Sequence, residues 1–423
     1  MRLAIISDTH FGDPMCALMD KSKKGVDIIN DEMYRKLREA VGEDINYLIL
    51  LGDILDDSIV NYCEAYKIAK IFFKRIKTDG IAREIIYIPG NHDFDVWHTV
   101  EYQVNVINRI NKGLPVRLFK QSLPAVMDLR EKSTNKDLVL PGVEEKKGTI
   151  KYSGLFLDNI TGIGSPTHFN FAYPNMYIIT DDRTILLTHG QYFQQYWSIA
   201  GEVITKIAKK DLQIDYPISI KELVGLNFPT NQLASSGVGQ AYPLTPLIRK
   251  IQRDVKDGDF KDLKKYIERL KKYTDENMEF PILQSYKELF SDFVLNQIKK
   301  VIFNYIEEIE SPRFDSGFIF SEDFENRFTA YYKSCLEEIE ELKDENINVP
   351  DPDFMIFGHT HAPIPWNSGK VKKITINNQT RKITLYNTGG WLYRHDRYSG
   401  KEFCGAEIFI YDDINDFSSI QIQ

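Results

Sequence analysis

The feature that most constrains this chain is a set of five short blocks rich in histidine and aspartate, each placed directly after a run that reads as a buried strand. The runs are Leu3–Ser7, Tyr47–Leu51, Glu84–Ile88, Thr184–Thr188 and Phe354–Phe357. The blocks that follow them are Asp8-Thr9-His10, Gly52-Asp53, Gly90-Asn91-His92-Asp93, His189-Gly190 and Gly358-His359-Thr360-His361. In a doubly wound α/β sheet the carboxyl ends of the strands line one edge. We therefore expect side chains from the whole length of the chain to meet there.

The residue types in these blocks are those that bind transition metals. Five of the 8 histidines fall in them, and imidazole nitrogen together with carboxylate oxygen suits Zn²⁺, Mn²⁺ or iron. The candidate ligands are too many for one ion: Asp8, His10, Asp53, Asn91, His189, His359 and His361. Two ions about 3.5–4 Å apart and bridged by a carboxylate would use them all. Such a pair stabilises in-line displacement at phosphorus and lowers the pKa of a bridging water, which gives hydroxide at neutral pH.

The strand-like runs of the first part alternate with helical segments, predicted over Val26–Val41 and Asn61–Ile76. This alternation favours right-handed crossovers and a sheet covered on both faces. From about residue 191 to residue 350 the pattern is helical, and Ser321 starts its last helix; strand patterns then return. We therefore predict a first core part over 1–190, a helical insertion or cap over 191–350, and a completing core part over 351–423.

Composition and charge argue against several classes of protein. The 423 residues carry a net charge of −8, whereas a dedicated binder of nucleic-acid backbones shows a basic excess. No apolar run approaches the roughly 18–20 residues of a membrane helix, the start of the chain lacks a signal-peptide core, and the four cysteines have no zinc-knuckle spacing. These features predict a cytoplasmic protein without a transmembrane segment and leave its oligomeric state open.

Taken in this order, the D-x-H, GD, GNHD, H and GHTH blocks resemble the signature of the calcineurin-like metallophosphoesterase superfamily. The resemblance covers roughly residues 1–192 and 353–387 and leaves the insertion outside. It implies a four-layer α/β/β/α sandwich, so the whole chain would be an α/β fold of this kind with a large helical insertion.

The resemblance also implies a role for each block residue. Asp8, His10 and His361 would hold the first metal ion; Asn91, His189 and His359 would hold the second; and Asp53 would bridge the two. His92 is similar to the family's non-ligand histidine, which contacts the phosphate and protonates the leaving oxygen, and Asp56 matches the carboxylate that orients it. The implied cofactors are two divalent metal ions. Mn²⁺ is favoured, and the same ligand set also accepts Fe, Zn and Ni.

The sequence thus predicts a dinuclear metal-dependent phosphoester hydrolase, a phosphatase or a phosphodiesterase, acting on a small molecule, a nucleotide or a lipid-linked substrate. Asp57 and Asp93 stand where phosphoprotein phosphatases of the superfamily carry arginine and glutamate. The missing arginine removes a bidentate phosphate clamp, which argues against a protein phosphatase. A DNA-repair-type metallonuclease is one alternative, although the acidic chain disfavours nucleic acid. A partner-binding scaffold with an inactive core is the other, and the complete ligand set argues against it.

Overall fold

The computed structural model describes residues 1–133, 137–143, 169–194, 218–232, 317–366, 371–376, 381–396 and 400–423, with a few isolated positions between these ranges. The chain divides into two compact units. One is formed by Met1–Gln240 together with Asp315–Gln423, and the other by Ala241–Phe314. Nearly all of the second unit lies outside the described residues, so the fold described below is that of the first.

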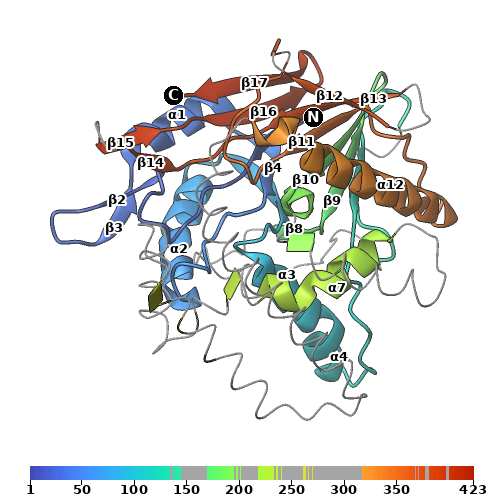
Figure 1. Cartoon of the computed structure of the whole chain (residues 1–423), viewed down its shortest axis with the longest axis horizontal. Coiled ribbons are helices and arrows are strands. Elements are labelled where there is room, and N and C mark those ends of the chain that lie inside the picture. The colour runs from blue at the N-terminus through green and yellow to red at the C-terminus, as the bar shows by residue number, and fades with distance from the viewer. Residues whose placement is uncertain are drawn as a thin grey trace. The chain divides into compact units, whose positions relative to one another are not determined.

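One sheet has six strands in the order β17-β16-β1-β4-β5-β8 (Figure 1). β1, β4, β5 and β8 run parallel, and β16 and β17 add to the edge beside β1 in antiparallel fashion. Their bounds are Arg2–Ile6 (β1), Ile45–Leu51 (β4), Ala82–Ile88 (β5), Phe169–Phe171 (β8), Ala406–Asp412 (β16) and Asp416–Ile422 (β17). The inner parallel strands are buried on both faces, which is why β1 and β4 are nearly continuous apolar runs.

The second sheet has seven strands in the order β12-β13-β11-β10-β9-β6-β7. The pairs β13–β11, β11–β10 and β9–β6 are parallel, and the others are antiparallel. The bounds are Ala125–Asp128 (β6), Leu138–Val139 (β7), Asn175–Ile179 (β9), Thr184–Thr188 (β10), Phe354–Phe357 (β11), Lys372–Thr375 (β12) and Lys382–Asn387 (β13). Two small hairpins complete the strands: Met19–Lys21 (β2) with Asp27–Ile29 (β3), and Tyr393–Asp396 (β14) with Gly400–Phe403 (β15).

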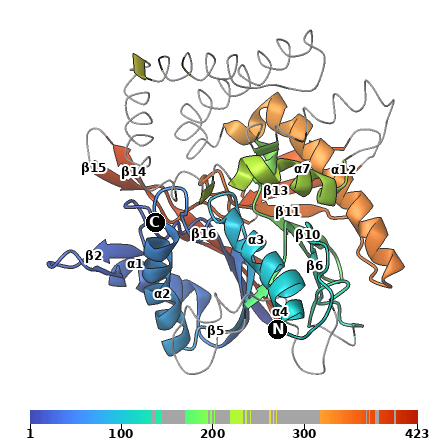
Figure 2. The same cartoon turned by 90° about the horizontal axis from the view of Figure 1, so that it is seen from below.

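The two sheets pack face to face, and helices cover their outer faces. Tyr386 of β13 contacts Phe409 of β16, with ring centroids 6.1 Å apart. On the six-stranded sheet Phe73 of a covering helix contacts Phe169 of β8 at 5.4 Å. Figure 2 shows α1 and α2 on the side of the sheets opposite to α12. These helices are Asp31–Val41 (α1), Tyr62–Thr78 (α2) and Glu322–Asp344 (α12). The mixed α/β class with parallel-rich sheets is therefore confirmed.

Side-chain caps explain where these three helices begin. The side chains of Asn30, Asn61 and Ser321 each accept a hydrogen bond from a backbone N–H in the first helical turn, which satisfies a donor that has no partner inside the helix. The other helical elements are Phe94–Tyr102 (α3), the π-helical turn Gln103–Ile107 (η1), Asn108–Ile110 (α4), Gln191–Phe193 (η2), Ile220–Gln232 (α7) and Phe318–Phe320 (η4). None of the helices in the described part of the chain is long and apolar enough to cross a membrane.

The structure corrects one of the predicted helices and limits another prediction. The helix predicted over Val26–Val41 is wrong at its start, because Asp27–Ile29 pairs with Met19–Lys21 as a hairpin and the helix begins only at Asp31. Within 191–350 the described residues include α7 and α12 but no separate helical cap. α12 instead packs against the seven-stranded sheet, where the Tyr331 hydroxyl donates to Asn175 Oδ1 of β9 at 2.6 Å. Most of the remaining insertion lies outside the described residues.

Glu338 adds buried hydrogen bonds to the contact between α12 and the second sheet. Its buried carboxylate accepts hydrogen bonds from Ser122 Oγ at 2.7 Å, Asn175 Nδ2 at 2.8 Å and the Tyr177 hydroxyl at 2.8 Å. We predict that Glu338→Ala lowers the free energy of unfolding by about 3 kcal/mol, because three buried donors lose their acceptor. Glu340, which is exposed on the same helix, serves as the control. The free energy of unfolding of Glu340→Ala should stay within about 0.5 kcal/mol of the wild-type value. Equal effects of the two variants in urea denaturation would contradict this.

Candidate metal centre

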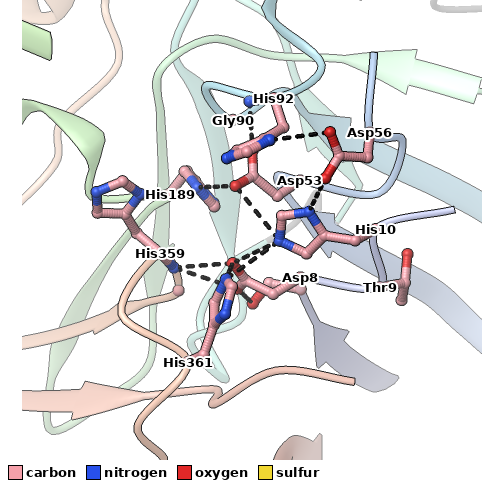
Figure 3. A network of polar contacts seen from close by, with 12 residues as sticks. Asp8, Thr9, His10, Asp53, Asp56, Gly90, His92, His189, His359 and His361 are labelled. Carbon is pink, nitrogen blue, oxygen red and sulfur yellow. Dashed lines mark hydrogen bonds and ion pairs between the residues drawn. The ribbon is translucent and has the colours of Figure 1, made fainter. Parts of the chain in front are cut away.

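The loops after β1, β4, β5, β10 and β11 converge on one buried cluster of histidines and carboxylates (Figure 3). The first three strands belong to the six-stranded sheet and the last two to the seven-stranded sheet, so the cluster lies where the edges of the two sheets meet. Every residue that the sequence placed in the site is in this cluster or in direct contact with it: Asp8, His10, Asp53, Asp56, Asn91, His92, His189, His359 and His361.

The first group of potential metal ligands is Asp8, His10, Asp53 and His361, with one ligand atom from each lying within 4.8 Å of the others. His361 Nε2 is 3.1 Å from Asp8 Oδ1 and 3.1 Å from His10 Nε2. All four side chains are buried, none with more than 1% of its surface exposed. Four donor atoms this close together, shielded from water, are the arrangement that a shared cation stabilises.

The second group contains Asp53, His189 and His359, and Asn91 joins it because its Oδ1 is 3.1 Å from His189 Nε2. Asp53 belongs to both groups through a single oxygen. Its Oδ2 lies 3.2 Å from His189 Nε2 and 3.7 Å from His10 Nε2. Its other oxygen, Oδ1, accepts the backbone N–H of His92 at 2.7 Å. Asp53 is therefore the carboxylate that the two groups share.

Asp56 connects the first group to His92. Its Oδ2 is 2.9 Å from Nδ1 of His10, and its Oδ1 is 3.1 Å from Nδ1 of His92 (Figure 3). The Asp56 carboxylate thus contacts Nδ1 of both imidazoles. Nε2 of each ring is then directed toward other groups. Ser58, which sequence reasoning missed, strengthens the arrangement because its hydroxyl donates to Asp56 Oδ1 and also lies 2.9 Å from His92 Nδ1.

The backbone around the cluster is strained in a way that few residues tolerate. Of the nine non-glycine residues with positive φ in the described ranges, five carry the site: Asp8, His10, Asp53, His359 and His361. Each such conformation costs about 1–3 kcal/mol and persists only where the surroundings impose it. Glycine is needed beside them, since a Cβ on Gly358 would lie 2.4 Å from Asp8 Oδ2 and one on Gly90 would lie 2.3 Å from Asp53 Oδ1.

Burial and the neighbouring charges set the protonation of the cluster. Burial alone would raise the pKa of Asp53, but the charges of His189 and His92 outweigh it and hold that pKa well below its usual range. Burial alone would lower the pKa of His10, but its hydrogen bonds to Asp56 and Asp8 raise it to about 10. The pKa of His189 is raised to about 9, because the nearby charge of Asp53 outweighs burial. The cluster therefore exchanges imidazole protons for any cation that binds.

His359 differs from the other imidazoles of the cluster. Burial and the charge of His189 hold its pKa well below the usual range, so its ring is neutral. Its Nε2 is 2.6 Å from Gln194 Oε1. Because an amide oxygen only accepts hydrogen bonds, Nε2 carries the proton and Nδ1 carries the lone pair. That Nδ1 is buried and has no hydrogen-bond partner within the described residues. A buried lone pair without a donor fits a metal ion.

Gln194 and Asp93 support the site, and sequence reasoning assigned neither to it. Asp93 accepts the backbone N–H groups of Gly90 at 2.6 Å and of Ile54 at 2.7 Å, so it ties the loop after β5 to the loop after β4. Its position directly after the Gly90-Asn91-His92 run is a sequence signal that places it near the site. Gln194 lies five residues after His189 in no recognisable motif, and its role depends on a contact that sequence spacing does not show.

Comparison with protein families agrees with the geometry. Residues 1–219 match the model of the calcineurin-like phosphoesterase family, which is just over half of the chain. The chain belongs to the calcineurin-like phosphoesterase family. The matched region of this family member ends before His359 and His361. In the structure both histidines nevertheless lie beside the aspartates and histidines of the matched region. No curated protein matches the chain.

The raised pKa values of His10 and His189 make metal uptake depend on pH. Below pH 9, binding of divalent ions has to displace imidazole protons, so we predict that uptake of Mn²⁺ by the metal-free protein releases protons and that affinity rises with pH up to about 9 to 10. Titration calorimetry in buffers of different ionisation enthalpy measures the protons released. An affinity that is flat between pH 6 and pH 9, with no proton release, would show that these imidazoles are not ligands.

The contact of Gln194 with His359 predicts a selective defect. Removing a residue that orients a metal ligand typically weakens binding by about 10–100-fold, so Gln194→Ala should weaken binding of one ion by about tenfold and spare the other. Gln194→Glu keeps an acceptor oxygen and should bind both ions. Equal loss of both ions in Gln194→Ala, or none, would contradict the assignment.

Proposed function

We propose that the protein is a dinuclear metal-dependent phosphoester hydrolase. The observation that carries this proposal is the position of Asp53, whose Oδ2 faces one set of nitrogen and oxygen donors on each side. The chain's membership of a phosphoesterase family supports the same conclusion. The residues fit two divalent ions because every donor is an imidazole nitrogen, a carboxylate or an amide oxygen, the set that Mn²⁺, Fe and Zn²⁺ accept.

In this proposal Asp8, His10 and His361 hold one ion, Asn91, His189 and His359 hold the other, and Asp53 bridges them. Two such ions supply positive charge for the phosphoryl oxygens and lower the pKa of a nearby water, so that it can attack phosphorus. We propose Mn²⁺ as the metal. Because the cluster is buried, the charge it presents to a phosphate is set by its own groups and ions, and the net charge of −8 does not oppose an anionic substrate.

His92 is proposed to protonate the leaving group. Its side chain is 14% exposed, whereas those of His10 and His189 are fully buried, so it is open to an incoming substrate. Asp56 and Ser58 hold Nδ1 of the ring, which orients Nε2 for the transfer. Its backbone N–H donates to Asp53, which keeps the ring close to the bridging carboxylate. A positioned proton donor of this kind contributes about 10²–10⁴-fold to a rate.

The domain boundaries proposed for the chain are core parts 1–190 and 351–423 with a helical insertion over 191–350 between them. The connectivity supports this. β10 and β11 are parallel neighbours, with Ile185 paired to Phe354, and the chain leaves β10 at the end that carries His189. The insertion therefore starts at the metal centre.

A substrate panel tests the proposal. With Mn²⁺ added, the protein should hydrolyse p-nitrophenyl phosphate or bis-p-nitrophenyl phosphate. We expect Asp53→Ala to lose metal and most activity, and His92→Gln to retain both ions while its rate falls by about 10²–10⁴-fold. The matched control is His98→Gln, a histidine of α3 that packs against Phe119 and Phe228 outside the cluster, and it should keep the wild-type rate.

Three outcomes would overturn parts of this proposal. Loss of metal in His92→Gln would show that the ligand assignment is wrong. Absence of turnover on both substrates with two ions bound would favour an inactive scaffold. Cleavage of single-stranded or duplex DNA well above turnover of both small esters would favour a metallonuclease.

A further inference from the structure

Exposed apolar side chains are concentrated in one short segment. Among the described residues eleven large apolar side chains are exposed, and six of them lie between positions 102 and 118. These six, named here the 102–118 patch, are Tyr102, Ile107, Ile110, Leu114, Val116 and Leu118. Leu118 is 93% exposed and Ile110 is 60% exposed. Single exposed apolar residues are ordinary on a protein surface, but a cluster marks a surface that binds something.

The patch residues lie together because the chain folds back on itself. The helical stretch formed by α3, η1 and α4 ends at Ile110, and the segment that follows returns along it. The backbone N–H of Leu114 donates to Arg109 O at 2.9 Å, and that of Arg117 donates to Asn105 O at 3.0 Å. Figure 1 shows α4 projecting beyond the two sheets. The patch therefore occupies one projection of the first unit.

The returning segment places its aliphatic side chains outward. Leu114, Val116 and Leu118 alternate with other residues, and their exposed fractions are 46%, 57% and 93%. Phe119, the next residue, faces inward and contacts the His98 ring of α3 at 5.5 Å. Pro115 and Arg117, which lie between the three aliphatic residues, are exposed as well. The stretch therefore presents three aliphatic side chains and a cation together to the solvent.

The charged residues of the segment that carries the patch have one sign. No aspartate or glutamate occurs from position 102 to position 127, whereas Arg109, Lys112, Arg117 and Lys120 all do, in a chain whose net charge is −8. Lys120 is half-buried and lies near Glu345 and Glu101, so part of its charge is balanced within the protein. The other three cations lie among the patch residues. Aliphatic side chains flanked by cations complement a layer of anionic headgroups over an apolar interior.

We propose that the 102–118 patch docks the protein on anionic lipid membranes. Ile110 and Leu118 enter the interface, and Arg109, Lys112 and Arg117 lie against the lipid phosphates. The proposal is independent of the hydrolase function, since it uses none of the residues of the metal centre.

Vesicle sedimentation with the full chain tests the docking. The protein should bind vesicles of phosphatidylcholine mixed with phosphatidylglycerol, bind pure phosphatidylcholine far less, and dissociate as salt is raised. We expect Leu118→Asp to lower the partition coefficient about tenfold, because an apolar anchor becomes an anion. Lys112→Glu should lower it by at least about fivefold, the effect of one cation at an anionic surface. Because both residues are exposed, neither change should alter the melting temperature.

Matched controls come from exposed residues elsewhere. Ile414 is 91% exposed between β16 and β17, and Lys23 is exposed in the β2–β3 hairpin, so Ile414→Asp and Lys23→Glu should bind vesicles as wild type does. Absence of binding to the mixed vesicles, or binding that the patch variants leave unchanged, would overturn the proposal. So would self-association of the wild type in light scattering that Leu118→Asp abolishes, because the patch would then be the contact between two copies of the chain.

Discussion

The site depends on the burial of three carboxylates at one point of the fold. Asp8, Asp53 and Asp56 are each no more than 1% exposed, and an ionised carboxylate without a partner in a protein interior costs several kcal/mol. Imidazoles from four loops provide that compensation, and the hydrogen bonds of His10 to Asp56 and of His189 to Asp53 raise the pKa of both rings. The buried carboxylates and the protonated imidazoles therefore stabilise each other. Bound cations can take the place of the imidazole protons.

The same cluster joins the two sheets. The loops after β1, β4 and β5 contribute the aspartates, His10, Asn91 and His92, whereas the loops after β10 and β11 contribute His189, His359 and His361. A ligand bound by both sets would therefore stabilise the packing of the sheets as well as the site, by the general linkage between binding and folding. The positive φ angles at five of these residues show that the backbone accepts strain to bring the ligand atoms together.

The location of the cluster could be predicted because each block directly follows a buried strand, and β10 and β11 have the predicted bounds, Thr184–Thr188 and Phe354–Phe357. Contacts between loops could not be predicted. Gln194 reaches His359 from no motif. The helix predicted from Val26 failed because hairpin pairing of β3 with β2 outweighed helical spacing. Asn30 followed by two acidic residues marked the true start of the helix.

The proposed function requires Asp53 to lie between two metal ions. Diffraction from crystals grown with Mn²⁺, measured on both sides of the manganese absorption edge, locates these ions directly. We expect two anomalous peaks per chain, one beside Asp8, His10 and His361 and one beside Asn91, His189 and His359, with Asp53 Oδ2 between them. A single peak, or peaks away from Asp53, would contradict it.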